Sequence, residues 1–465
     1  KGARVIRLEQ NYRSTQNILD AANAVIRNNQ GRKGKELWTR AGEGEKLQLY
    51  TAMNENDEAQ YVAARILEDY SQGRHWKDHA VLYRMNAQSN QVEQAFKRNG
   101  IPYRIIGGTR FFDRAEVKDM IAYLAVLNNP EDDLRLTRII NNPPRGIGAK
   151  TVETAQEIAR REGVSLFAVI DNARMYPELD RAAAKLAQFS GMMGELAQQA
   201  QTMPLPDFYE ELIARTGYAV MLESKNTVED RTRLENVREL LTSINGYLEN
   251  AGEEPSLAGF LDEIALYTDL DSRVDGDNCV TMMTMHAAKG LEFPVVFLPG
   301  MDEGIFPGVR SLMEESRLEE ERRLCYVAIT RAKKELYLCN AHMRTMYGQM
   351  KPYAASRFLE EIPSDLIDHV GSDRKQETIK SAGRWHNESR SRYALSDSAV
   401  VNKPKKAGTK ARYDWKVGDT AVHNLWGKGK VVAVMGKDKN MMIKVDFQGK
   451  VRQLMVTFAP IRKEE

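Results

Sequence analysis

A short polar segment near the start of the chain carries side chains that can bind a nucleotide. Residues 10–14 (QNYRS) lie between a predicted strand and a predicted helix. At such a corner Arg13 can offer its guanidinium fork to a phosphate, and Tyr12 can stack on a base. The alternative is structural, with Ser14 or Thr15 simply capping the helix that follows.

A second segment, residues 284–293 (TMHAAKGLEF), follows a predicted buried strand. Because α/β proteins bind ligands where parallel strands end, we expect its polar side chains, His286, Lys289 and Glu292, to gather at that carboxyl edge. A single histidine in such a place is more often a structural residue. Four polar functional groups within nine residues favour the functional interpretation.

The third segment, residues 319–332 (EEERRLCYVAITRA), predicts a helix with one buried face. Its charged start is consistent with a solvated first turn, where the helix dipole favours glutamates. Arg331 lies beyond these charges and beside Thr330. That placement suits an arginine that meets a phosphate better than one in an exposed salt bridge.

The fourth segment, residues 143–151 (PPRGIGAKT), precedes an amphipathic helix. It is not a P-loop, because a P-loop has Gly directly before its Lys, and here Ala149 precedes Lys150. We interpret it as a hairpin between helices, in which Gly146 and Gly148 let backbone N–H groups approach a nucleic-acid phosphate. An ordinary turn between two helices is the alternative.

Around these segments, short apolar runs alternate with helical stretches, which predicts an open, mostly parallel sheet. The predicted strands lie at 47–50, 80–83, 280–283, 295–298 and 336–339, with a helix at 58–70. From 113 to 275 the pattern is helical, because apolar residues recur at spacings of three and four, as in 186–200 and 234–244. The fold class is therefore α/β, with a parallel-sheet domain split by an all-helical insertion.

The end of the chain has a different character. Residues 371–412 are rich in Ser, Arg, Lys, Asn and Gly and predict a disordered linker. From Trp415 onward, short alternating runs with turn glycines predict a small β-barrel of about fifty residues. The predicted boundaries are 1–112 and 276–366 for the two parts of the sheet domain, 113–275 for the insertion, 367–412 for the linker and 413–465 for the β module.

The overall composition excludes several classes of protein. Of 465 residues, 42% are hydrophobic and 28% are charged, as in soluble proteins with real cores, and the length favours three domains. No apolar run is long enough for a membrane span, and the N-terminus does not resemble a signal peptide. The three cysteines lack disulfide or zinc spacing, so we expect a reducing, intracellular setting and no metal site.

The net charge of +2 is unevenly distributed along the chain. Residues 372–412 hold 11 Lys and Arg against 4 Asp and Glu, and residues 413–465 hold 10 against 6, so the rest of the chain is acidic. A basic tail on an acidic body predicts a polyanion or an acidic protein surface as the partner of the tail. A solvated linker that maintains solubility is the alternative for 372–412.

Taken in order, the four segments closely resemble the bacterial UvrD/Rep/PcrA family of DNA helicases, and its PcrA members most. QNYRS, TMHAAKGLEF and ITRA resemble motifs IV, V and VI of that family, and residues 102–114 (PYRIIGGTRFFDR) match it as well. The resemblance spans nearly the whole chain. It implies a RecA-like motor domain split by the helical insertion, followed by a Tudor-like β-barrel.

For the nucleotide, the resemblance implies that Tyr12 stacks on adenine and that Arg13 and Arg331 contact the γ-phosphate. Arg331 would be an arginine finger, which stabilises the charge that develops in phosphoryl transfer. The other residues implied around the nucleotide are Glu292 at the ribose, with Gln10 and Lys289 near the cleft.

For DNA, the resemblance implies that Asn86 touches the single strand and that His286 couples the nucleotide cleft to the DNA track. Residues implied to grip duplex DNA are Gly146, Ile147, Gly148 and Lys150. The β module at 413–465 would bind RNA polymerase. A cytoplasmic, nucleoid-associated bacterial protein without a membrane partner is implied.

One departure from the family is large. Its first motor domain supplies the Walker A lysine, the Mg²⁺-binding acids and a water-positioning glutamine, but this sequence has no G-x-x-x-x-G-K-[ST] and no acidic pair at a suitable strand end. Because phosphoryl transfer depends on positioning and electrostatics, we expect these residues alone not to hydrolyse ATP.

The chain begins with Lys1 rather than Met, so we expect it to be a piece of a longer protein. That protein would be an ATP-dependent 3′–5′ DNA helicase using ATP with Mg²⁺. The alternative is a non-enzymatic module that binds DNA and RNA polymerase.

Overall fold

The computed structural model describes residues 9–30, 34, 36–250, 255–271, 277–370, 415–423, 427–435, 442–447, 450–456 and 461–463. The chain divides into two compact units, 1–368 and 369–465. The predicted linker at 371–412 lies outside the described residues. Within the described ranges, no helix is both long and apolar enough to cross a membrane, and no group of three or more His, Cys, Asp or Glu side chains is arranged to hold a metal ion.

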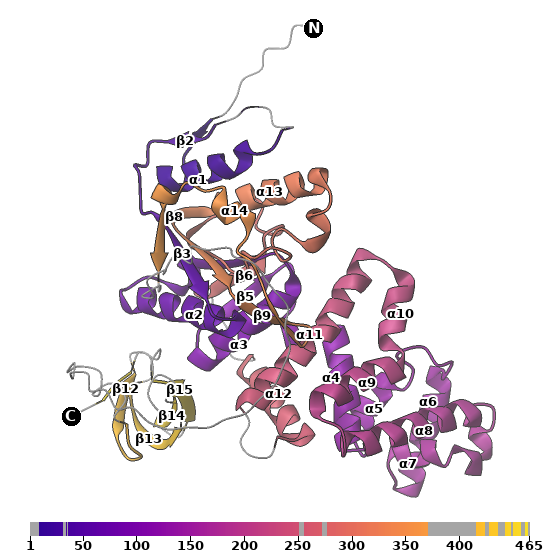
Figure 1. The fold of residues 1–465 in the computed structure, drawn as a ribbon. Helices are drawn as coiled ribbons and strands as arrows, with labels where there is room; N and C mark the ends of the chain where they lie inside the picture. Colours follow the sequence, from indigo (N-terminus) through magenta and orange to yellow (C-terminus); the bar gives the residue numbers. More distant parts are fainter. Residues whose placement is uncertain are drawn as a thin grey trace, which may run out of the picture. The chain divides into compact units, whose positions relative to one another are not determined.

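A seven-stranded sheet organises the first unit (Figure 1). Six neighbouring strands, from β3 across to β5, run parallel, and β11 lies beside β3 at the edge. In spatial order the strands are β11 (Ile367–Val370), β3 (Leu47–Ala52), β8 (Ala332–Ala341), β7 (Phe293–Leu298), β4 (His79–Tyr83), β6 (Val280–Thr284) and β5 (Tyr103–Ile106). The predicted parallel sheet is confirmed, and each predicted strand lies within one of these.

Helices cover both faces of the sheet, because its central strands are apolar on both sides. In β4, Ala80 and Leu82 pack into one core, whereas Val81 and Tyr83 pack into the other. Figure 1 shows the two helical layers on opposite sides of the sheet. The first layer contains α1 (Gln16–Arg27), α13 (Glu315–Ile329) and α14 (Arg357–Glu360), and the second contains α2 (Glu55–Ser71) and α3 (Ser89–Asn99).

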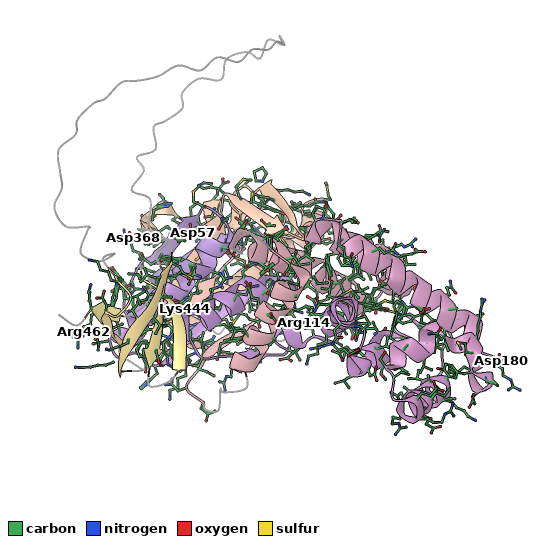
Figure 2. The ribbon with its side chains drawn as sticks, turned by 90° about the horizontal axis from the view of Figure 1, so that it is seen from below. Asp57, Arg114, Asp180, Asp368, Lys444 and Arg462 are labelled. Atoms are coloured by element: carbon green, nitrogen blue, oxygen red, sulfur yellow. The ribbon has the colours of Figure 1, made fainter. Side chains whose placement is uncertain are left out.

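Between β5 and β6 the described chain is helical and builds its own core. The stripes predicted at 186–200 and 234–244 are buried there. Figure 2 labels Asp180 at the end of this insertion that is farthest from the sheet. Its helices are α4 (Ala115–Asn128), α5 (Asp133–Ile139), α6 (Ala149–Glu162), α7 (Leu166–Asp171), α8 (Ala183–Ala200), α9 (Leu205–Thr216), α10 (Tyr218–Lys225), α11 (Val228–Asn250) and α12 (Leu257–Asp271). An α/β fold with a helical insertion is confirmed, while its limits at 113 and 275 stay a prediction.

A buried guanidinium joins the insertion to the sheet. Arg114 (Figure 2) donates to Asn236 Oδ1 on α11 at 2.7 Å, to Ser89 Oγ at 2.8 Å and to the Asn86 carbonyl at 3.2 Å. Asn236 in turn donates to Glu116 on α4 at 2.7 Å. Because buried polar groups are costly when unpaired, this network holds α4 and α11 of the insertion against the turn that carries Asn86.

Two short sheets complete the first unit. Strand β1 (Gln10–Asn11) pairs in parallel with β2 (Trp38–Thr39), just before α1. Strands β9 (Met343–Met346) and β10 (Gln349–Pro352) form an antiparallel hairpin that follows β8. Each of these small sheets places a turn at one of the sites described below.

The second unit is a five-stranded antiparallel sheet, in the order β15-β14-β13-β12-β16. Its core contains Trp415, Val431, Ile443 and Phe447. A Cβ at Gly429 would lie 2.6 Å from the Phe447 ring, so only glycine allows this close packing. The predicted small β module is confirmed, with β12 (Thr420–His423), β13 (Gly427–Met435), β14 (Met442–Phe447), β15 (Lys450–Met455) and β16 (Ile461–Lys463).

Candidate functional site

The first candidate site lies at the amino ends of two neighbouring parallel strands, β7 and β8. Phe293 of β7 pairs with Ala332 of β8, so the residues that precede these strands, Glu292 and Arg331, come to the same edge. The Phe293 N–H donates to the Arg331 carbonyl at 3.0 Å. Strand pairing therefore brings together two predicted nucleotide residues from separate motifs.

The QNYRS segment reaches this edge immediately after β1. Asn11 Oδ1 accepts the N–H groups of Arg13 and Ser14, at 2.7 and 2.9 Å, which closes a tight turn. The buried Ser14 hydroxyl donates to the Ala332 carbonyl at 2.6 Å and anchors that turn to β8. The capping alternative is wrong, because Thr15 occupies the N-cap position of α1 but makes no side-chain capping bond.

Opposite charges meet on this face. Arg13 Nε forms a close ion pair with the Glu292 carboxylate, and Lys333 Nζ lies 2.8 Å from the other carboxylate oxygen. Hydrogen bonds from Lys333 and then from Arg13 lower the pKa of Glu292 to about 2. Arg13 also donates to the Thr330 carbonyl at 3.3 Å. Lys333 was not predicted as a site residue, although its position at the start of the strand that follows ITRA indicates that it lies at this edge.

Arg331 is held by neutral oxygen atoms. Its guanidinium donates to the carbonyls of Val327 and Leu291, at 2.9 and 3.0 Å, and to the Thr330 hydroxyl at 3.1 Å. Burial and then the nearby charge of Arg13 lower its pKa. A fixed, mostly buried cation bonded to neutral acceptors can still attract an anion that approaches this edge.

Of the other predicted nucleotide residues, Tyr12 and Lys289 are exposed and Gln10 is half-buried. The Tyr12 ring is 84% exposed, and its hydroxyl donates to Gln10 Oε1 at 3.0 Å, so the ring is oriented yet open to stacking. Lys289 is also exposed, in the turn whose main chain bonds back to the His286 carbonyl. Tyr12 therefore has the accessibility that base stacking requires.

The prediction that His286, Lys289 and Glu292 gather at one carboxyl edge is wrong. Strands β6 and β7 are parallel members of the sheet, and β4 lies between them. Their connection must therefore cross from the carboxyl edge back to the amino edge. His286 remains at the end of β6, whereas Glu292 arrives at the start of β7. One motif thus serves two edges of the sheet.

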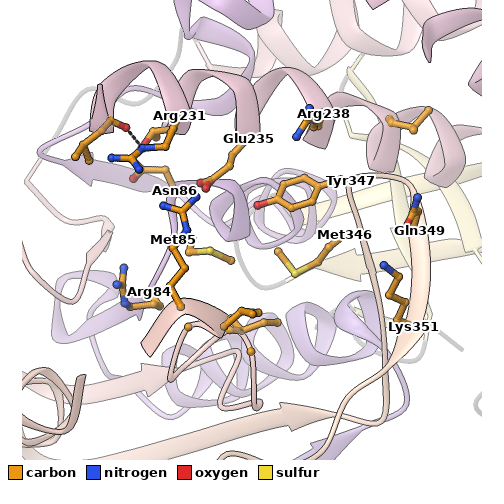
Figure 3. A pocket seen from close by; sticks show the side chains of 18 of the residues that line it. Arg84, Met85, Asn86, Arg231, Glu235, Arg238, Met346, Tyr347, Gln349 and Lys351 are labelled. Atoms are coloured by element: carbon orange, nitrogen blue, oxygen red, sulfur yellow. Dashed lines mark hydrogen bonds between the residues drawn. The ribbon is translucent and has the colours of Figure 1, made fainter. Parts of the chain in front are cut away.

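The second candidate site is a cleft of about 1090 Å³ at the carboxyl ends of β4 and β6 (Figure 3). Asn86 follows β4 and His286 follows β6, and the pairing of these strands brings both residues to the cleft. Helix α11 and the β9–β10 hairpin form the other walls. This volume is at the upper end of small-molecule pockets, of about 300–1,000 Å³, and suits a polymer segment.

The cleft is predominantly cationic. Burial raises the pKa of Glu235 above its ordinary value, and the surrounding arginines offset only part of that rise. Burial and then the charge of Arg84 lower the pKa of His286, which favours the neutral form of its ring. A positive lining with neutral polar groups suits a phosphate backbone and its bases. The charged lining residues are Arg84, Arg231, Arg238, Arg310 and Lys351, with Glu210 and Glu235 as the acids.

One aromatic ring in the cleft was not predicted. Tyr347 lies at the tip of the β9–β10 hairpin with a φ of 54°, a conformation that non-glycine residues rarely adopt. Figure 3 shows its side chain among those lining the cleft. The tip is held by α11, because Glu239 accepts the Tyr347 N–H at 3.4 Å and Thr242 accepts the Gly348 N–H at 3.3 Å. Such strain persists where surrounding structure enforces it, often at functional sites.

The 143–151 turn lies between α5 and α6 and is held from inside the insertion. Arg145 donates to the Tyr123 hydroxyl at 2.7 Å and to the Thr216 carbonyl at 3.2 Å. Asn141 Oδ1 accepts the Arg145 N–H at 2.7 Å. Gly146 has a φ of 67°, which favours glycine at this position. The turn is therefore more elaborately supported than an ordinary helix–helix connection.

Within this turn, the prediction that Ile147 contacts DNA is not supported. Its side chain is 1% exposed in the core of the insertion, and its N–H already donates to Asn141. Lys150 is exposed in the first turn of α6, after Gly148 at the N-cap. Lys185 of α8 donates to the Gly146 carbonyl at 3.1 Å and adds a second cation beside the turn.

The charge cluster of α13 is not a solvated first turn. The helix begins at Glu315, so the cluster lies in the second turn, where Glu321 and Arg322 are buried. Arg322 pairs with Glu361 at 2.8 Å, and Glu321 pairs with Arg84 of the cleft at 2.7 Å. Two of the five charged residues at 319–323 are therefore paired inside the molecule.

Comparison with known proteins agrees with this architecture. Residues 6–342 match the UvrD-like helicase C-terminal domain, and residues 417–463 match the PcrA/UvrD tudor domain. The chain belongs to the UvrD-like helicase family. The ATP-dependent DNA helicase PcrA of Bacillus subtilis (strain 168) is 42% identical over 474 residues, covering 99% of this chain and 63% of the relative.

Two staphylococcal relatives give the same result for this UvrD-like helicase chain. PcrA of Staphylococcus epidermidis RP62A is 41% identical over 468 residues and PcrA of Staphylococcus aureus Mu50 is 39% identical over 467. Each alignment covers the whole of this chain and 62–63% of the relative. The chain thus spans less than two thirds of the length of the helicases it matches.

The amino-edge face generates a prediction about pH. The folded-state pKa of Glu292, about 2, lies below its ordinary value of 4.5, so its pairing stabilises the fold above pH 4.5 and is lost as the pH falls towards 2. Carboxyl ¹³C NMR between pH 3 and 7 should show Glu292 ionised throughout. In Lys333→Gln, which removes the stronger donor, its midpoint should rise into this range. A wild-type midpoint above pH 4 would contradict the ion-pair geometry.

Proposed function

We propose that this chain is the C-terminal part of an ATP-dependent DNA helicase that translocates 3′ to 5′ on single-stranded DNA and unwinds duplex DNA. One observation carries the proposal: a single sheet has a face of arginines at its amino edge and a cationic cleft at its carboxyl edge. Membership of the UvrD-like helicases, and relatives named ATP-dependent DNA helicase, support it.

At the amino edge the ligand is ATP. Tyr12 stacks on adenine, and Arg13 and Arg331 contact the γ-phosphate, where the fixed Arg331 offsets the charge that develops during transfer. Glu292 accepts a hydrogen bond from the ribose, and Gln10 and Lys289 lie beside the nucleotide. Mg²⁺ would neutralise phosphate charge, and its ligands belong to a facing motor domain, since the described part of this chain has no such group of acids.

At the carboxyl edge the ligand is single-stranded DNA. The cations of the cleft contact its phosphates, Asn86 contacts a base edge and Tyr347 stacks on a base. His286 lies where the bound DNA strand meets the segment of the chain that crosses the sheet to Glu292. In the insertion, the backbone at Gly146 and Gly148, with Lys150 and Lys185, contacts duplex DNA. Ile147 supports that turn from the core.

A non-enzymatic module that binds DNA and RNA polymerase is the second candidate. The lack of a P-loop in these 465 residues favours it. The fixed geometry of Arg13, Glu292 and Arg331 disfavours it, because a DNA-binding scaffold does not need a phosphate-binding face. The two candidates differ in whether ATP binds when a P-loop domain is supplied.

The ATPase prediction separates these candidates. This chain alone should not hydrolyse ATP, but it should do so, with stimulation by oligo(dT), when mixed with the part of the Bacillus subtilis relative that it does not match. Arg331→Ala should lower that rate ~10³-fold or more, because arginine fingers contribute this much. Lys334→Ala, at an exposed neighbour on β8, is the matched control. Undiminished activity in Arg331→Ala would exclude the arginine-finger role, and failure to bind nucleotide in the mixture would favour the scaffold.

The DNA prediction concerns Tyr347. Replacement by Ala should weaken oligo(dT) binding to this chain by roughly 5- to 100-fold, since base stacking on an aromatic ring contributes about 1–3 kcal/mol. The salt dependence should be unchanged, because no phosphate contact is lost. Fluorescence anisotropy measures both, with Tyr176→Ala on the insertion as the control. Equal affinities for the two variants would exclude base stacking at the hairpin.

The β module generates a separate prediction. Because residues 369–465 form their own unit, we propose that 413–465 tether the helicase to RNA polymerase on the bacterial nucleoid in the cytoplasm. Deleting 413–465 should reduce co-purification of RNA polymerase and leave oligo(dT) affinity unchanged. Equal recovery of polymerase with and without the module would exclude this role.

A further inference from the structure

One ion pair connects the nucleic-acid cleft to the helix that ends at the nucleotide face. Arg84, which lines the cleft just after β4 (Figure 3), donates through Nε to both oxygens of Glu321, at 3.0 and 3.2 Å, and through Nη2 at 2.7 Å. The Glu321 side chain is 8% exposed. Such a bidentate, largely buried pair fixes the direction of the arginine, and losing either partner is costly.

Helix α13 extends from this pair towards the opposite edge of the sheet. Glu321 lies in its second turn beside the carboxyl end of β4, and the helix ends at Ile329, two residues before Arg331, which immediately precedes β8. The ten residues from Glu321 to Arg331 correspond to about 15 Å along a helix. The last turn holds Arg331 directly, since Val327 accepts its Nε at 2.9 Å.

The other recorded ion pairs of α13 do not reach a residue of the cleft. Glu320 pairs with Arg323 one turn further along the same helix, and both side chains are exposed. Arg322 pairs with Glu361, beyond α14. Among the ion pairs that α13 makes in the described part of the chain, the one through Glu321 reaches a residue of the cleft.

Glu321 also acts on a second residue of the cleft. Its charge, and less strongly that of Glu320, raises the pKa of His286, against the larger lowering by burial and by Arg84. A phosphate that enters beside Arg84 competes with Glu321 for the guanidinium. A buried carboxylate that loses part of its pairing is destabilised, which favours a shift of Glu321 and of the helix that carries it.

We propose that Glu321 is a positioning residue that transmits occupation of the cleft by a nucleic-acid strand along α13 to Arg331. The coupling rests on the proposed function, since it requires that the cleft binds DNA. The Arg84–Glu321 ion pair has two states, paired and partly released. Binding of the nucleic-acid strand shifts the equilibrium between them. Arg331 is then presented differently to a nucleotide according to whether a strand is bound.

Amide hydrogen exchange on the full chain, with and without saturating oligo(dT), tests this without requiring ATP hydrolysis. In the wild type, DNA should slow exchange both in the cleft, at 84–88, and at the end of α13, at 324–331, by about 5-fold or more at the helix. In Glu321→Gln, which keeps the shape but removes the charge, the cleft should remain protected and the response at 324–331 should be lost. Glu320→Gln, on the exposed side of the same turn, is the matched control and should behave as wild type.

The outcomes separate the coupling from the proposed function. Equal protection of 324–331 in Glu321→Gln and Glu320→Gln, or a protected cleft with no helix response in the wild type, overturns the coupling alone. No protection anywhere in the wild type overturns DNA binding, and the coupling with it. Thermal unfolding confirms that Glu321→Gln is folded. If it is not, Arg84→Lys breaks the bidentate pair from the other side, and a helix response equal to that of the wild type overturns the proposal.

Discussion

The parallel orientation of β6 and β7 is the constraint on which both candidate sites depend. Consecutive parallel strands must be joined by a crossover, so the segment from Met285 to Glu292 has to traverse the sheet. That single requirement places His286 at one edge and Glu292 at the other. It also explains why one short motif supplies residues to both candidate sites.

Buried charges hold the movable walls of the cleft in place. Arg344, at the base of the β9–β10 hairpin, pairs with Glu58 at 2.7 Å and with Asp302 at 2.6 Å, and all three side chains are buried. Arg114 performs the same task for the insertion. Since a buried ion without its partner is far more costly than an exposed one, these pairs favour one arrangement of hairpin and insertion around the cleft.

The sheet and the insertion could be predicted from the sequence because their signals are local: apolar runs for buried strands and spacings of three and four for helices. Arg13 and Arg331, which we propose contact the nucleotide, could be singled out from the sequence because each lies within a short motif. The opposite placement of His286 and Glu292 is not a local signal of the motif, because it follows from the parallel orientation of the strands before and after it. Tyr347 was missed for a related reason, since its ring reaches the cleft only through packing of the hairpin on α11.

The charged side chains at the amino edge form one part of the proposed binding site. Glu292 lies between Arg13 and Lys333 and keeps these cations from repelling each other, while Arg331 is bonded only to neutral oxygens in the hydrogen bonds that the structure records for it. Under the proposed function, a phosphate that pairs with Arg13 replaces part of the Glu292 charge and frees that carboxylate to accept a ribose hydroxyl. The exchange keeps the cations compensated at each stage, so binding need not expose an unpaired charge. A facing domain that supplies the remaining phosphate contacts would complete the site without rearranging this half.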